Sequence, residues 1–144
     1  MAEVLAIASG IAGILSLTIE VIGISYKYIA GVRGASDAVQ GFVKELEELK
    51  VVLLKIEEIA EESDDRQIFG HSGSCLLSIE DGGDYLELLG PIHEKLKKGS
   101  GHDSIRKKLK ALTWPFSEDK TLALISMLHR HLEIFKTALA VDNL

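Results

Sequence analysis

The sequence has few of the residues that cross-link small proteins through disulfides or break helices. Its 144 residues include one cysteine and two prolines. A single cysteine excludes an internal disulfide framework and favours a reducing compartment. Basic residues are also fewer than acidic ones, 16 against 22, and the resulting net charge of −6 argues against duplex nucleic acid as a partner. The length fits one domain with a core of its own.

Motifs of common catalytic and metal sites are missing as well. No G-x-x-x-x-G-K-[ST] occurs, which excludes a nucleotide site of that kind. The stretch 70–74 reads Gly-His-Ser-Gly-Ser, which is not the G-x-S-x-G nucleophile elbow, and no predicted strand precedes it. His129 and His131 lie about 200° apart around a helix and cannot share a metal. We interpret His93 as a helix-seam residue and Cys75 as a buried, inert thiol, and we expect no enzyme activity, metal or cofactor.

What the sequence has in excess is one long apolar run near its start. Residues Val4 to Ile19 carry no charge, and Val4–Tyr26 carries only Glu20. The run explains why mean hydropathy is +0.18 in a chain of which 26% is charged. A secretory signal peptide is disfavoured, because the run lacks a basic start and the only early charge is Glu3.

Two interpretations of this run stay open. A membrane-spanning helix is long enough, since the stretch would extend about 35 Å. Against it, Glu20 would cost about 2.5–3.5 kcal/mol near the bilayer centre. The other interpretation is a helix apolar on all sides and buried at the centre of a bundle, which we expect for the resting state. The residues expected to enter a membrane are Val4, Leu5, Ile7, Ile11, Ile14, Leu15, Leu17, Ile19 and Ile22.

Small residues recur at four-residue spacing along the same run. Such pairs allow a second helix to approach closely, in a bundle or in a membrane. The pairs are Ala6/Gly10, Ser9/Gly13 and Ala12/Ser16. We therefore assign Gly10 and Gly13 to helix packing.

The next segment predicts an amphipathic helix that ends near residues 62–64. Ser36 or Asp37 can cap its start. Apolar residues alternate at spacings of three and four, which is typical of one seam in a bundle. The seam comprises Val39, Phe42, Leu46, Leu49, Leu53, Ile56 and Ala60.

Three further helices are predicted in the second half. One covers about 74–98, with a kink or break near Gly82–Gly83 or Pro91 left open, and a loop follows at 99–101. Its seam is Ile79, Gly83, Leu86, Leu89, His93 and Leu96. A short helix covers 104–112. Ser117 caps a last helix to about residue 140, whose seam is Leu122, Ile125, Leu128, Leu132, Phe135 and Leu139.

The predicted fold class is therefore all-α. We expect an antiparallel bundle of four main helices plus a short one, packed around the apolar N-terminal helix. The turn 113–116 separates the last two helices, because Pro115 disfavours helix at Trp114. We expect Trp114 and Phe116 to pack against one end of the bundle, with a membrane-interface role for the tryptophan as the alternative.

Charge is distributed unevenly along the chain. Residues 45–65 hold nine acidic residues and two lysines, whereas 95–110 hold seven cationic residues and one aspartate. The cationic span is either a solvated helix end favoured by the helix dipole or a docking patch for anionic lipid headgroups. The candidate headgroup residues are Lys95, Lys97, Lys98, Arg106, Lys107, Lys108 and Lys110.

Several segments resemble the fungal HeLo-like domains. These domains stand at the N-terminus of fungal STAND (NLR-type) receptors and of amyloid-signalled cell-death executioners. The similar segments are 2–5, 24–29 with 32–33, 49–54, the W-P-F turn within 109–116, and 128–135 with Ala138, Leu139 and Asp142. The resemblance covers nearly the whole chain and implies one domain over 1–144, which we expect to be excised from a longer protein.

The resemblance implies a membrane-permeabilising cell-death domain of fungal immunity or heterokaryon incompatibility. In that family the apolar N-terminal segment enters the plasma membrane after oligomerisation, and residues 4–26 match it here. It implies a cytoplasmic resting state, a plasma-membrane active state, and as partners anionic lipids, further copies of the chain and an NLR-type receptor. The alternative is a soluble signalling or oligomerisation module, because every predicted helix has a complete seam without a membrane.

Overall fold

Four long helices form the part of the chain that the structure describes. The computed structural model describes residues 2–31, 36–62, 81–101 and 114–142. The helices are α1 (Ala2–Gly31), α2 (Asp37–Glu62), α4 (Asp81–Gly101) and α6 (Glu118–Asp142). No strand occurs within these ranges, so the predicted all-α class is confirmed. The predicted short helix at 104–112, and residues 74–80 of the predicted third helix, lie outside the described residues.

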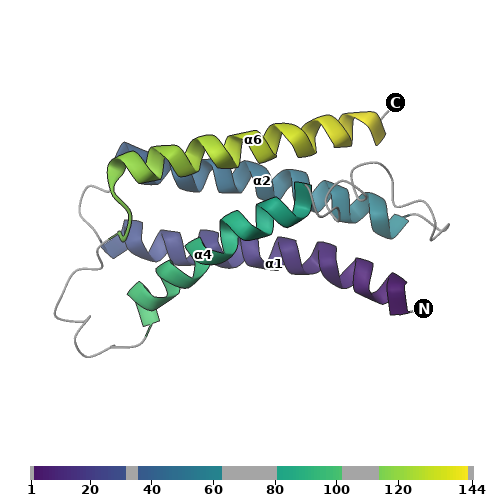
Figure 1. Ribbon diagram of the computed structural model, residues 1–144, viewed down its shortest axis with the longest axis horizontal. Coiled ribbons are helices and arrows are strands. Elements are labelled where there is room, and N and C mark those ends of the chain that lie inside the picture. The colour runs from purple at the N-terminus through teal and green to yellow at the C-terminus, as the bar shows by residue number, and fades with distance from the viewer. Residues whose placement is uncertain (1, 32–35, 63–80, 102–113, 143–144) are drawn as a thin grey trace.

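Successive helices run in opposite directions, as predicted (Figure 1). As a consequence, α2 and α6 run parallel to each other, and so do α1 and α4. In the first pair Gly41 faces Ile125 and Glu45 contacts His129, so the residue numbers increase in the same direction along both helices. In the second pair Thr18 contacts Tyr85 and Tyr28 contacts Leu96, so α1 and α4 also run in the same direction. α1 packs on both α2 and α4, and α2 also packs on α6. The contact between α1 and α2 therefore joins the two parallel pairs.

α2 forms its predicted seam at the centre of the core. Its start is capped by Ser36, whose Oγ accepts a hydrogen bond from the Val39 N–H at 3.4 Å. Six of the seven predicted seam residues are buried, and Ala60 is half-buried. The buried six are Val39, Phe42, Leu46, Leu49, Leu53 and Ile56. The alternating spacing of three and four residues was sufficient to find this face.

The predicted seam of α6 is wrong at its first residue. Leu122 is 49% exposed, whereas Thr121 and Leu124 are buried at 1% and 2%. The threonine is buried without loss, because its hydroxyl donates a hydrogen bond to the Ser117 carbonyl at 2.8 Å. The predicted cap itself is present, since Ser117 Oγ accepts a hydrogen bond from the Lys120 N–H at 3.1 Å.

α4 also differs from its prediction. The helix is unbroken across Gly82–Gly83 and Pro91, and it continues to Gly101 through the predicted loop at 99–101. Its buried face is shifted, because Leu86 is 39% exposed and the neighbouring Tyr85 is fully buried. The phenol is accommodated there because its hydroxyl pairs with Thr18 of α1.

α1 lies on the side of the bundle, not at its centre. Over Gly10–Ala30, 39% of the helix is buried. Ile19 and Tyr26 are each 46% exposed, whereas the inner face carries Ile11, Ile14, Leu15, Val21, Ile22 and Tyr28 in the core. The expectation that all sides of this helix are buried is therefore wrong, because α2 and α4 cover only one side of it.

The shifted seam of α6 gives a matched test. We expect Leu124→Ala to lower the free energy of unfolding by about 2–5 kcal/mol, since it leaves a cavity in the core. Leu122→Ala removes the same atoms from an exposed position and should change it by less than about 1 kcal/mol. Urea denaturation followed by circular dichroism measures both. Equal losses in the two variants would show that the seam is placed incorrectly.

Candidate functional site

α1 holds all nine residues expected to enter a membrane, and the bundle buries four of them. Ile11, Ile14, Leu15 and Ile22 are buried in the core. Leu17 is half-buried, and Ile19 lies on the outer face. Val4, Leu5 and Ile7 fall in the first turns of α1, where only the backbone is described. Most of the described candidates could therefore meet lipid only if α1 left its place on α2 and α4.

The outer face of α1 is lined with small residues. Ala12, Gly13, Ser16 and Gly23 are exposed there. A Cβ built on Gly13 or Gly23 would meet no atom within 4 Å, so no described helix crosses α1 at these glycines. Gly10 is half-buried. Close approach of a second helix at Gly13 stays a prediction for contacts with another molecule.

The seam between α1 and α4 contains polar contacts at three levels. Thr18 Oγ1 lies 2.7 Å from the Tyr85 hydroxyl, and also donates a hydrogen bond to the Ile14 carbonyl. Two residues further along α1, Glu20 Oε2 lies 3.0 Å from His93 Nε2. Near the end of α1, the Tyr28 hydroxyl donates a hydrogen bond to the Leu96 carbonyl at 2.8 Å. Glu20, the only carboxylate of the apolar run 4–26, thus has a partner on α4.

Aromatic side chains close the end of the bundle where α1 and α4 finish. The Trp114 ring packs edge-on against Tyr28 of α1, Phe42 of α2 and Phe116, at centroid distances of 5.6, 5.3 and 5.6 Å. Its Nε1–H donates a hydrogen bond to Thr121 Oγ1 of α6 at 3.0 Å. The W-P-F turn therefore contacts three helices at once and fixes their relative positions at this end.

The described basic candidates lie at this same aromatic end. Lys95, Lys97 and Lys98 are exposed in the last turns of α4, and Lys95 Nζ lies 5.5 Å from the centre of the Phe116 ring. Arg106, Lys107, Lys108 and Lys110 lie outside the described residues. The acidic C-terminal turns of α2 lie at the opposite end of the bundle (Figure 1). The described lysines of α4 and the acidic last turns of α2 thus lie at opposite ends of the bundle.

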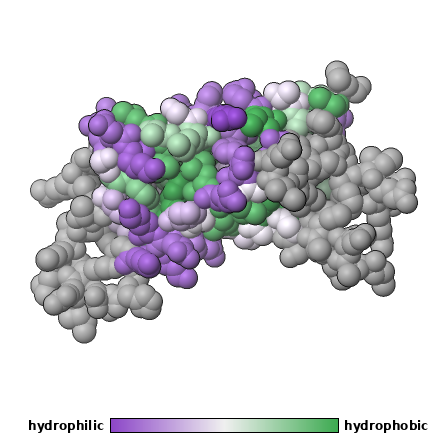
Figure 2. Space-filling model, viewed as in Figure 1, coloured by the Kyte–Doolittle hydropathy of each residue, from purple (hydrophilic) through white to green (hydrophobic). Residues whose placement is uncertain are grey.

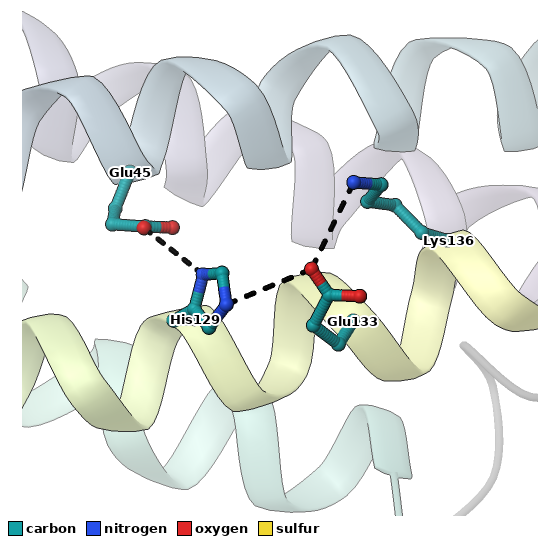
Figure 3. A network of polar contacts seen from close by, with 4 residues as sticks. All are labelled: Glu45, His129, Glu133 and Lys136. Atoms are coloured by element: carbon teal, nitrogen blue, oxygen red, sulfur yellow. Dashed lines mark hydrogen bonds and ion pairs between the residues drawn. The ribbon is translucent and has the colours of Figure 1, made fainter.

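A different polar network joins α2 to α6 (Figure 3). His129 Nδ1 lies 3.1 Å from Glu45 Oε1, and His129 Nε2 lies 3.6 Å from Glu133 Oε1. Lys136 Nζ extends the network to Glu133 at 3.8 Å. The histidine thus bridges two carboxylates across a seam that does not involve α1.

His131 occupies a gap between α4 and α6. Its ring stacks on Phe135 at a centroid distance of 6.2 Å and meets Tyr85 edge-on at 5.5 Å. Burial lowers the pKa of His131, with a further lowering by Arg130 that is opposed by Asp84 and Asp81. Burial also raises the pKa of the Tyr85 hydroxyl. Both rings are therefore neutral near pH 7 and serve as packing groups.

No metal-binding arrangement is found among the described residues. No group of three His, Cys, Asp or Glu side chains gathers there in a way that could hold a metal ion. One described helix, over Gly10–Ala30, is long and apolar enough to cross a membrane by length and composition. The candidate site is therefore α1 with the surfaces that hold it.

Comparisons with known proteins identify no relative. No family model matches the chain. No curated protein and no solved structure matches it. The candidate site must therefore be interpreted from its own geometry.

Sequence reasoning missed the partners of α1 on α4. Thr18–Tyr85 and Glu20–His93 join residues more than 60 positions apart, so no local pattern connects them. One signal was present: a lone carboxylate in an apolar helix needs a polar partner or water. His93, a polar residue on a predicted seam, was the available candidate.

The buried ring of His131 predicts loss of stability in acid. Because the pKa of His131 is lowered in the folded state, the unfolded chain binds the proton more tightly. The part of the free energy of unfolding that depends on the neutral ring is therefore lost as pH falls below about 6.5. We expect the free energy of unfolding to fall between pH 7 and pH 5, and His131→Phe to reduce that fall. Urea titrations at several pH values measure it. An unchanged pH dependence in the variant would contradict the assignment.

Proposed function

We propose that this domain acts on membranes through α1, which is stored in the bundle at rest and enters the bilayer after activation. The proposal makes the chain a cell-death effector that permeabilises the plasma membrane, as its resemblance to HeLo-like domains implies. It is cytoplasmic at rest and assembles with further copies when active, under the control of an NLR-type receptor. One observation carries it: α1 is long and apolar enough to span a membrane, yet only 39% of its most apolar 18-residue window is buried in the bundle.

The outer face of α1 supports this proposal. A helix that serves only as one wall of a water-soluble bundle normally carries charge on its outer face. Here the exposed positions are mostly small or apolar, and include Ile19 and Tyr26. The described outer face carries charge only at Glu20, which pairs with His93, and at Lys27 near the end of the helix. Few charges would therefore have to be dehydrated when α1 moves from the bundle into lipid.

The basic end suggests how the domain approaches a bilayer. Lys95, Lys97 and Lys98 lie beside the C-terminal end of α1, so docking through them brings Tyr26 and Lys27 to the surface first. Tyrosine and lysine are residues that favour the membrane–water interface. The acidic end of α2 then points away from an anionic membrane, which avoids repulsion. In this orientation the N-terminus of α1 starts far from the surface.

A second candidate function is a soluble oligomerisation module. It is favoured by apolar surface that does not belong to α1. Figure 2 shows such an area between α6 and α4, which make few contacts with each other. Leu86, Leu122 and Met127 are exposed on these helices. In this case further copies of the chain would cover the area, and α1 would never leave the core.

A charge on the outer face of α1 distinguishes the two functions. Ile19→Lys should leave the fold intact because the position is exposed, but it should reduce dye release from anionic vesicles at least tenfold, since a lysine costs about 2.5–3.5 kcal/mol within a bilayer. Leu122→Lys is the matched control, with a similarly exposed residue on α6, and should release dye like the wild type. Circular dichroism checks that both variants fold. Equal release by all three proteins, or none from the wild type, would oppose the membrane function.

The basic end predicts a salt-dependent lipid affinity. Replacing Lys95, Lys97 and Lys98 with glutamine should weaken binding to anionic vesicles by up to about 100-fold, because each lysine contributes about 1 kcal/mol near the surface. Lys136→Gln removes a lysine of α6 that pairs with Glu133, and should have little effect. Vesicle co-sedimentation at low and high salt measures the affinity. Binding that ignores both salt and the triple substitution would refute a headgroup role.

A further inference from the structure

A shallow groove opens between α1 and α4. Its volume is about 430 Å³, which lies within the range of about 300–1,000 Å³ that is typical of small-ligand sites. The residues that α1 supplies recur at spacings of three and four, so they share one face of the helix, and those of α4 lie one turn apart. The lining residues are Glu20, Gly23, Ile24 and Lys27 of α1, and His93 and Lys97 of α4.

Opposite charges follow one another along this groove. Glu20 lies in its first part, where its Oε2 is 3.0 Å from His93 Nε2. Because α1 and α4 run in the same direction, Lys27 and Lys97 both come later, towards the aromatic end of the bundle (Figure 1). Glu20 and Lys27 are about 10 Å apart along the helix axis, at a rise of about 1.5 Å per residue. The groove therefore has one carboxylate further in and two ammonium groups at the aromatic end.

The middle of the groove is open, because α1 carries a glycine there. A Cβ built on Gly23 would meet no atom within 4 Å. Ile24 adds an apolar wall beside it. The Glu20 side chain is 62% exposed, so a ligand in the groove can reach its carboxylate. A small ligand can thus lie along the backbone of α1 between the two kinds of charge.

This pattern of charge selects a class of ligand. A simple anion such as inorganic phosphate is attracted by Lys27 and Lys97 but repelled by Glu20. The headgroup of phosphatidylserine carries the complementary set, since its phosphate and carboxylate match two lysines and its ammonium matches a glutamate. Phosphatidylglycerol offers the phosphate alone and leaves the glutamate without a cationic partner on the lipid.

We propose that the groove between α1 and α4 binds the headgroup of phosphatidylserine. The phosphate and the serine carboxylate lie beside Lys27 and Lys97, and the ammonium reaches inward to Glu20. This direction fits a bilayer that meets the aromatic end of the bundle, because the phosphate of the lipid is closer to the acyl chains than its amine is. The inference rests on the proposed membrane function and names the lipid that the domain recognises.

Binding to two kinds of vesicle with equal charge tests the groove. Phosphatidylserine and phosphatidylglycerol carry the same net charge, so a surface that responds to charge alone binds both equally. At equal mole fractions, we expect the full chain to bind phosphatidylserine vesicles about three- to tenfold more tightly, because two more partly exposed ion pairs form. Vesicle co-sedimentation measures both affinities. A ratio near one for the wild type would overturn the proposal.

Removing the carboxylate tests the contact with the serine ammonium. Glu20→Gln should bring the ratio of the two affinities close to one, because the ammonium loses its partner. Lys95→Gln is the control, since this lysine lies over the Phe116 ring and does not line the groove. It should weaken binding to both lipids equally and keep the wild-type ratio. A preference that persists in Glu20→Gln, or is lost in Lys95→Gln, would contradict the site.

Filling the groove tests the site without any change of charge. Gly23→Leu should remove the preference for phosphatidylserine and leave the circular dichroism spectrum unchanged, because the added side chain points into open space. Gly13→Leu is matched to it, since Gly13 has the same open space on α1 but does not line the groove. This variant should keep the wild-type ratio. Equal ratios in the two leucine variants would overturn the site, and this test remains if Glu20→Gln does not fold.

Soluble competitors distinguish a lipid headgroup from free phosphate. Glycerophosphoserine, which is the headgroup without acyl chains, should remove the preference for phosphatidylserine vesicles. Inorganic phosphate at the same concentration should not. Equal competition by the two compounds would show that the groove recognises phosphate alone and would overturn the proposal.

Dye release from the same vesicles separates the groove from the membrane function. If the wild type prefers phosphatidylserine but releases dye from neither kind of vesicle, the groove stands and the permeabilising function fails. If dye is released from both kinds while the affinity ratio is near one, the function stands and the groove fails. Preference together with release supports both.

Discussion

An apolar helix of this length must be covered by something, and the rest of the fold follows from that constraint. Hydrophobic burial is the main favourable term in folding, and α1 offers water few polar groups in exchange. α2 and α4 cover one side of it, and the aromatic cluster around Trp114 fixes the end where these helices meet α6. The outer side is left mostly with small residues, together with Ile19 and Tyr26, which are each 46% exposed. The bundle therefore covers one side of α1 and leaves the other side exposed.

A bilayer is the other medium that can cover such a helix completely. The positions of charge agree with that use, because lysines gather where α1 ends and acidic residues gather at the far end of α2. The polar side chain of Thr18 on α1 is also compatible with both the bundle and a bilayer. Thr18 satisfies its hydroxyl within its own helix at Ile14 as well as on Tyr85, so it would not be left unpaired after separation. Glu20 and Tyr28 would lose their partners on α4, and Tyr26 would lose its hydrogen bond to Glu47 of α2.

The sequence predicted the four described helices and the seam of α2, but not the contacts between helices. The α2 face was found because Leu, Phe and Val recur there without interruption. The α6 face was misplaced at Leu122 because a threonine, polar by composition, is buried through a hydrogen bond to its own helix. In α4, the burial of Tyr85 was missed because its polar hydroxyl is satisfied by Thr18, which lies 67 positions away in the sequence. Pairing across distant helices depends on tertiary geometry, which periodicity does not contain.

An accessibility scan of spin labels along 17–25 of α1, on anionic vesicles, distinguishes a stored membrane helix from a permanent core helix. In the free domain, labels should be accessible at Ile19 and inaccessible at Val21 and Ser25, which repeats the burial pattern of the bundle. On vesicles, we expect this periodicity to disappear and collisions with oxygen to exceed those with a water-soluble nickel chelate all around the helix. If the periodicity of the free domain persists unchanged on vesicles that release their dye, α1 is not the element that enters the membrane.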